Sequence, residues 1–268
     1  MRKGKYLRQK EAPAKKRSHR SLALILALVL VVGSVVGGTV AWLIADTDPV
    51  VNTFTYGDID LELDETKTDE KGNPVDENGD GAPDKTTEGN EYEMTPGEEY
   101  LKDPAVTVLA GNEACWLFVK LEEKGGVTIT NADGSTTTYD FDDYLTYAVA
   151  DGWTQLADAQ GEAVEGIWFR YVGEDTDDTE VAYEVLKDNK ISVLENVTKD
   201  MLNALDNNGK DADTATYPSL SVTAYAVQYS GFEPEVSEGT TESTAEQINT
   251  AALSAWKVVE AQNTSVNP

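Results

Sequence analysis

The residues with the clearest potential for binding chemistry lie in an acidic stretch near position 80, DENGDGAPD. Its oxygen-bearing side chains occupy the first, third, fifth and ninth places, as Asp76, Asn78, Asp80 and Asp84. Calcium loops have this spacing because the hard cation takes about six to eight oxygen ligands from one tight turn of chain. The segment therefore predicts a calcium site.

The match to an EF-hand loop is incomplete. The twelfth place holds Thr87 where an EF-hand has a bidentate glutamate, and Glu88 comes one residue late. The surrounding range 66–90 is rich in charged residues and nearly free of apolar ones, so it is expected to form a long exposed loop. An acidic insertion without a bound ion is therefore the alternative interpretation.

Histidine and cysteine, the usual residues of catalytic and zinc sites, are almost absent. The one histidine, His19, lies in the basic N-terminal segment, and Cys115 is the one cysteine. After residue 41 the chain has no imidazole for a Ser/His/Asp triad, a Cys/His pair or an ordinary zinc site. Cys115 lies in the apolar run ACWLFV and is expected as a small core residue. We therefore expect no enzymatic activity and no required cofactor, with calcium as the one ion to consider.

The first 41 residues have the organisation of a signal peptide. Residues 1–20 carry nine basic side chains and one acid, and an apolar core follows over 21–41. This order is typical of export, and the small-x-Ala pattern TVA predicts that signal peptidase cuts between Ala41 and Trp42. The uncharged stretch continues to Ala45 and is long enough to cross a bilayer, so retention as a membrane anchor is the alternative. The expected location is secreted, in an extracellular matrix or at the cell surface.

Removing this leader makes the remaining chain strongly acidic. The whole chain has 21 basic and 49 acidic residues, and subtracting nine and one leaves 12 and 48, a formal charge of -36. Such a surface repels nucleic acid and anionic membranes and favours solubility. No nucleic-acid partner is therefore expected, and membrane contact is expected only through an uncleaved leader.

Strand patterns dominate after the leader. In residues 51–63, Phe54 and Tyr56 share one alternating phase and the apolar residues from Ile59 to Leu63 share the other, which predicts a β-bulge or a bend between two sheets. Further strands are expected over 105–110, 115–121, 127–130, 136–141, 166–172, 181–186, 191–194 and 220–229. Without βαβ alternation, they predict one mainly β domain over 42–268, an antiparallel jelly-roll-like sandwich.

One or two short peripheral helices should accompany the sandwich, in addition to the signal-peptide helix. Apolar residues recur at helical spacing over 197–205, and a second helix is expected over 243–261, docked on the sandwich. The sequence Ser243-x-x-Glu246 resembles a capping box for this second helix. Between two Thr-rich runs, the turn sequence NADG at 131–134 predicts a β-hairpin.

The sequence that joins the leader to the first strand reads GGTVAWLIADTD at 37–48 and NTFTYGDIDL at 52–61. A later stretch, MTPGEEYLKDPAVTV at 94–108, has a Pro-Gly turn before an expected strand. Both stretches resemble the TasA/camelysin family of exported proteins of Gram-positive bacteria, which a dedicated signal peptidase, SipW, processes. The resemblance covers the leader and the first third of the remaining chain.

This resemblance implies a jelly-roll sandwich with a structural role at the cell surface or in a biofilm matrix. Family members assemble into filaments in which the N-terminal segment of one subunit completes a sheet of the next, a form of strand addition. Here the assembly strand would include Val51, Phe54 and Tyr56, and the partners would be other copies and other matrix or surface components. The alternative is that residues 50–63 pair within their own domain.

Two other functions are open. A monomeric, calcium-stabilised surface adhesin or binding module would use the acidic loop rather than the N-terminal strand. Camelysin-like members have been regarded as metallopeptidases, but a zinc site in this chain would have only carboxylates and Cys115 as ligands, which is unusual for zinc.

Overall fold

The structure is a computed structural model that describes residues 54–56, 59–130, 133–175, 179–208, 215–237 and 241–266. All of them belong to one compact unit, Thr47–Pro268. The predicted signal peptide, its cleavage point between Ala41 and Trp42, and Val51 lie outside the described residues. Among the described helices, none combines the length and the apolar character needed to span a bilayer.

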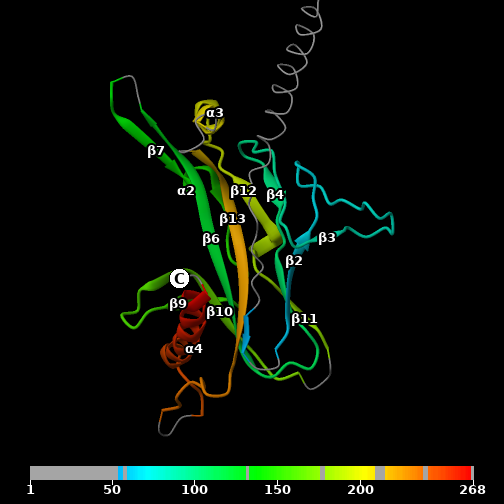
Figure 1. Ribbon diagram of the computed structural model, residues 1–268, viewed down its shortest axis with the longest axis vertical. Helices are drawn as coiled ribbons and strands as arrows, with labels where there is room; N and C mark the ends of the chain where they lie inside the picture. Colours follow the sequence, from blue (N-terminus) through cyan, green and yellow to red (C-terminus); the bar gives the residue numbers. More distant parts are fainter. Residues whose placement is uncertain are drawn as a thin grey trace, which may run out of the picture. The chain divides into compact units, whose positions relative to one another are not determined.

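The largest sheet has six strands and contains the two longest strands of the described chain (Figure 1). Its order is β1 (Phe54–Tyr56), β13 (Ala215–Gln228), β6 (Cys115–Thr130), β10 (Ala163–Val172) and β9 (Thr154–Ala157), and β7 (Thr136–Asp140) also pairs with β6. All of these pairs are antiparallel except that of β1 with β13, which is parallel.

Two smaller antiparallel sheets complete the β structure. One has the order β11 (Val181–Glu184), β5 (Ala105–Val108), β2 (Leu61–Thr66) and β3 (Lys85–Thr86); the other has the order β4 (Glu99–Leu101), β12 (Lys190–Val193) and β8 (Leu145–Thr146). The helices are α2 (Phe141–Tyr144), the 3-10 turn η1 (Lys187–Asn189), α3 (Lys199–Asn208) and α4 (Ala245–Val266). The mainly β, antiparallel class predicted from the sequence is therefore confirmed, whereas the jelly-roll likeness stays a prediction.

Both faces of the six-stranded sheet are buried where β6 begins. In β6, Cys115, Leu117 and Val119 join one core, while Trp116 and Phe118 join the other. The first core is shared with the smaller sheets, whereas α4 covers the second (Figure 1). A strand buried on both faces has a continuous apolar sequence, which explains the unbroken run at the start of β6.

Helix α4 is attached to the sheet by its buried face and by one side-chain amide. Asn249 accepts a hydrogen bond from the Ala157 N–H and donates one to the Ala157 carbonyl, both at 2.9 Å, and so occupies the outer edge of β9. The capping box is formed by Thr244 and Gln247, one residue later than the predicted Ser243 and Glu246. The two pairs have the same spacing and equivalent chemistry, so the sequence pattern did not distinguish them.

The predicted strands over 115–121 and 127–130 are one continuous strand, β6. Gly125 makes this possible because its φ is +98° and a Cβ at this position would collide with the Tyr217 carbonyl of β13. The predicted hairpin after β6 is present, since Thr130 pairs with Thr136. Short α2 was not predicted; its residues Phe141–Tyr144 follow β7 directly and end the strand one residue earlier than expected.

The change of phase between residues 56 and 59 coincides with a change of sheet. β1 pairs with β13 in the six-stranded sheet, and β2 pairs with β5 in the four-stranded sheet. Of the two alternatives drawn from the phase change, a bend between two sheets is therefore the one that agrees with the strand pairing.

Candidate functional site

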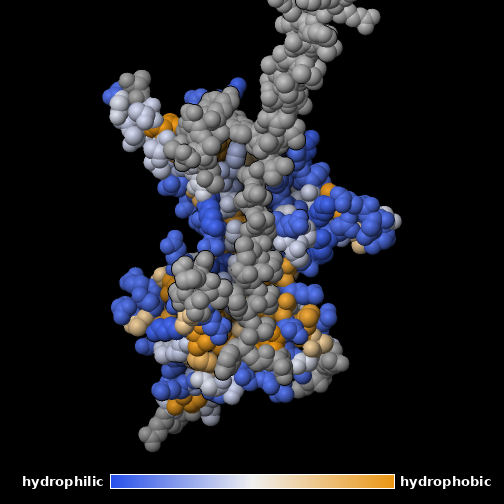
Figure 2. Space-filling view, viewed as in Figure 1, coloured by the Kyte–Doolittle hydropathy of each residue, from blue (hydrophilic) through white to orange (hydrophobic). Residues whose placement is uncertain are grey.

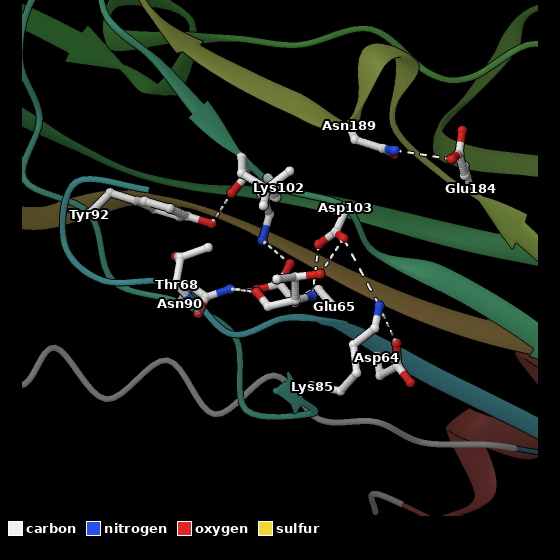
Figure 3. A network of polar contacts seen from close by, with 12 residues as sticks. Asp64, Glu65, Thr68, Lys85, Asn90, Tyr92, Lys102, Asp103, Glu184 and Asn189 are labelled. Atoms are coloured by element: carbon white, nitrogen blue, oxygen red, sulfur yellow. Dashed lines mark hydrogen bonds and ion pairs between the residues drawn. The ribbon is translucent and has the colours of Figure 1, made fainter. Parts of the chain in front are cut away.

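A polar network lies where β2 ends and the acidic segment begins (Figure 3). Glu65 of β2 pairs in register with Thr86 of β3, and Asp64 pairs with Ala105 of β5. These pairings bring the two ends of the 66–90 segment together, and Lys102 and Asp103 follow β4 into the same region. Hydrogen bonding within sheets therefore gathers residues that are far apart in sequence.

The centre of the network is a buried ion pair. Lys102 Nζ lies 3.0 Å from Glu65 Oε2, and the two side chains are only 10% and 7% exposed. Two charges removed from water are costly to bury, and their attraction offsets this cost only when the remaining polar atoms are also hydrogen-bonded. The second oxygen of Glu65 meets this requirement through Asn90.

Asn90 uses its whole side-chain amide. Its Nδ2 donates to Glu65 Oε1 at 2.9 Å and to the Thr66 carbonyl at 2.8 Å, and its Oδ1 accepts from the Thr68 N–H at 2.7 Å. A backbone N–H only donates and a carbonyl only accepts, so these neighbours fix which end of the amide is oxygen. The Glu65 carboxylate thus lies between the Lys102 amine and the Asn90 amide (Figure 3).

Aromatic and carboxylate groups surround this centre. The Tyr92 hydroxyl donates to the Leu101 carbonyl at 2.6 Å, and its ring packs 5.3 Å from the ring of Tyr100, which is 5% exposed. Burial, and then the charge of Glu65, raise the pKa of Tyr92, so its hydroxyl stays a donor. Asp103 accepts from the Thr66 N–H at 2.7 Å and from its hydroxyl at 2.6 Å.

The acidic segment forms a projection that is hydrophilic almost throughout (Figure 2). Asp76 accepts the N–H groups of Gly79 and Gly81, Asn78 accepts that of Asp80, and Asp80 accepts that of Ala82. Asp84 accepts from the Glu77 N–H at 2.7 Å and from the Asn78 amide at 2.8 Å. Among the hydrogen bonds of the four predicted calcium ligands, that between Asn78 and Asp84 is the one that joins two of their side chains.

These oxygens match calcium in kind but are not gathered around a common point. Within the ranges that the structure describes, no group of three or more His, Cys, Asp or Glu side chains is close enough to hold a metal ion. The carboxylates are directed to N–H groups of their own loop, which compensates part of their charge. Calcium binding therefore stays a prediction.

Cys115 is completely buried, and burial raises the pKa of its thiol to about 12. We expect the native chain to resist a thiol reagent at pH 9, while the chain in urea reacts at one thiol. The thiol of an unfolded chain has a pKa of about 8.5. Between that pH and about 12 only the unfolded state loses the thiol proton, so the free energy of unfolding should fall as the pH rises through this range. The absorbance of the thiolate that the reagent releases measures the rate of modification. Equal rates for the native and the unfolded chain would contradict the burial of Cys115.

The chain matches no protein-family profile, no curated protein and no solved structure.

The network around Glu65 was not predicted from the sequence, although the sequence contains a signal for it. Ile59, Leu61 and Leu63 define the buried phase of the strand, and Glu65 continues this phase. A glutamate at a core position requires a partner, which points to a buried cation elsewhere in the chain. The identity of that cation, Lys102, follows only from the strand pairing.

Proposed function

We propose that this chain is an exported, non-enzymatic structural protein of the cell surface or biofilm matrix that assembles by addition of its N-terminal strand. The observation that carries this proposal is the pairing of β1 with β13. Three residues pair in parallel, with Phe54 opposite Tyr225 and Tyr56 opposite Val227. A single short strand therefore borders the end of a much longer strand.

The edge of β13 supports strand addition. β13 pairs with β6 from Ala215 to Gln228, whereas its other edge has a described strand partner only at residues 225–227. Backbone groups along a sheet edge are a template for another strand, and main-chain hydrogen bonds supply the affinity. In the structure β1 pairs with β13 of its own chain, as in the alternative that residues 50–63 pair within their own domain. Exchange between copies would pair the same residues of two different chains.

The family resemblance at the leader and at residues 52–61 favours the same function. In this proposal, SipW-type cleavage between Ala41 and Trp42 releases an extended segment that contains Val51, Phe54 and Tyr56. The subunit then pairs with other copies and with other matrix components, and the TasA/camelysin-like role needs neither catalysis nor a cofactor. Its acidic surface keeps the single subunit soluble before assembly.

A pair of cysteines tests whether β1 exchanges between copies. In a Cys115→Ala background, Thr55→Cys and Ala226→Cys occupy directly opposed positions and are close enough for a disulfide. After oxidation of the assembled protein, we expect a ladder of linked chains on a non-reducing gel. Electron microscopy should show filaments, and replacing residues 42–56 by a Gly/Ser segment of equal length should abolish them.

The control places cysteines on two strands that belong to the same chain in any arrangement. Lys120→Cys and Thr223→Cys are opposed between β6 and β13 and should give bridges within one chain only. If the cysteines introduced at positions 55 and 226 form disulfides only within single chains of the filaments, exchange of β1 between copies is contradicted. An absence of filaments in all conditions would contradict assembly itself.

The second candidate function is a monomeric adhesin or binding module stabilised by calcium. The loop that contains Asp76 and Asp84 favours this function because its side chains offer the oxygen ligands that calcium prefers. The arrangement of these oxygens does not add support, because they are directed to N–H groups of the loop. In this case millimolar calcium should raise the melting temperature, and a chelator should reverse the increase. Asp76→Asn should remove the response, whereas Asp133→Asn, in a separate turn, should retain it. Identical melting with calcium and with chelator would exclude this function.

A further inference from the structure

The contacts of Glu65 place an amine and an amide at the two oxygens of one carboxylate. Lys102 Nζ lies 3.0 Å from Oε2, and Asn90 Nδ2 lies 2.9 Å from Oε1. The ion pair is almost completely buried, and the Tyr92 hydroxyl donates to the carbonyl of Leu101, the residue before Lys102. The Lys102 amine is a nucleophile and the Asn90 amide carbon is an electrophile. Glu65 contacts both side chains and can carry a proton between them, which an ion pair alone does not require.

The Asn90 carbonyl is also prepared for attack. The Thr68 N–H donates to Asn90 Oδ1 at 2.7 Å. A fixed backbone donor at this oxygen stabilises the negative charge that develops when a nucleophile adds to the adjacent carbon. On the other side of the amide, Nδ2 contacts the Thr66 carbonyl and Glu65, so the leaving nitrogen lies beside the proton carrier.

We propose that Lys102 and Asn90 become joined by an isopeptide bond, formed by the folded chain itself with Glu65 as the catalytic residue. This inference does not rest on the proposed assembly function. It requires the network around Glu65 and nothing from the N-terminal strand.

The reaction is balanced without an oxidant, a reductant or an added reactant. Glu65 accepts a proton from the Lys102 ammonium, and the neutral amine forms a bond from Nζ to Asn90 Cγ. The oxyanion is held by the Thr68 N–H until the bond from Cγ to Nδ2 breaks. Protonated Glu65 and the attacking nitrogen supply the two protons with which Nδ2 leaves as ammonium. Lysine ammonium and asparagine amide thus become a secondary amide and ammonium, with no change in total charge.

The bond has a structural consequence that follows from its place in the fold. Asn90 is the last residue of the acidic segment, and Lys102 follows β4, so the bond closes a covalent ring over residues 90–102. It also converts the buried lysine cation into a neutral secondary amide. The base of the exposed acidic segment is thereby held even when its hydrogen bonds open.

Mass analysis of the full-length chain tests the proposal directly. The linked chain should be lighter than its sequence by about 17 Da, the mass of ammonia. Trypsin should not cleave after Lys102, so a peptide covering residues 86–120 should carry the mass loss. Cyanogen bromide cuts after Met94, which lies between the two residues, so fragments 2–94 and 95–201 should remain joined on a denaturing gel.

Matched variants assign the roles. Glu65→Gln and Asn90→Ala should each give separate fragments and the unreduced mass, as should Lys102→Arg, which retains the charge but removes the nucleophilic amine. Glu184→Gln is the control, because Glu184 contacts Asn189 at 3.0 Å in an exposed Asn–Glu pair (Figure 3). This control should retain the link.

The wild-type result decides the proposal even if a variant fails to fold. Separate cyanogen bromide fragments and an unmodified tryptic peptide 86–102 from the folded wild-type chain would overturn it. A link that persists in Glu65→Gln would overturn the role of Glu65. Filament formation is measured on separate samples, so failure of one proposal is distinguishable from failure of the other.

Discussion

Replacing Trp256 with alanine should lower the free energy of unfolding by about 3–5 kcal/mol, the usual cost of removing a large buried aromatic side chain. Trp256 is 4% exposed, and its ring lies 5.3 Å from that of Phe118 and 5.4 Å from that of Tyr225. These contacts join α4 to β6 and β13 in the second core. The loss should appear as a lower urea midpoint.

Lys257→Ala provides the control for this prediction. Lys257 is the next residue of α4 and is exposed, so its replacement should leave the urea midpoint unchanged within error. If Trp256→Ala unfolds at the same urea concentration as the wild-type chain, α4 does not contribute to the stability of the sheet. A fall in the slope of the transition would instead show that α4 detaches before the sheet unfolds.

The mainly β class was predictable because period-2 alternation is a local property. Leu61 and Leu63 show it within a few residues, as do Val106 and Val108 of β5. The β6 strand was only partly predictable, because its apolar start does not alternate and a glycine pair interrupts it. The structure shows why: both faces are covered, and Gly125 allows close approach of β13.

Strand partners were not predictable from the same local patterns. The pairing of β1 with β13 joins Phe54 to Tyr225, and no turn residue between them specifies it. The cap of α4 shows a similar limit at short range, because Ser243 and Thr244 are each followed by an acid or amide three residues later. In the structure, Thr244 and Gln247 form the cap.

The site shows the same division between local and distant information. The oxygen spacing in 76–84 was visible because all the residues are close in sequence. The network around Glu65 joins positions separated by 25 residues to Asn90 and by 37 to Lys102. Neither separation leaves a pattern in a single sequence, so only the buried phase of Glu65 pointed to it.

Replacing Glu65 with alanine should lower the free energy of unfolding by about 3–5 kcal/mol, the usual cost of breaking a buried ion pair. This variant leaves Lys102 as a cation without its carboxylate partner, in a site where it is 8% exposed. Asn90 Nδ2 loses its contact with Oε1 at the same time. Urea unfolding followed by tryptophan fluorescence measures the change.

The comparison with Glu99→Ala isolates the effect of burial. Glu99 lies 2.7 Å from Lys190 Nζ, a shorter contact than that of Glu65, but the two side chains are 58% and 39% exposed. Water solvates both charges after the partner is removed, so the urea midpoint should barely change. Equal losses in the two variants would contradict this explanation, because contact distance would then matter more than burial. A large loss for Glu65→Ala alone would show that Lys102 depends on this carboxylate, because water cannot replace it inside the fold.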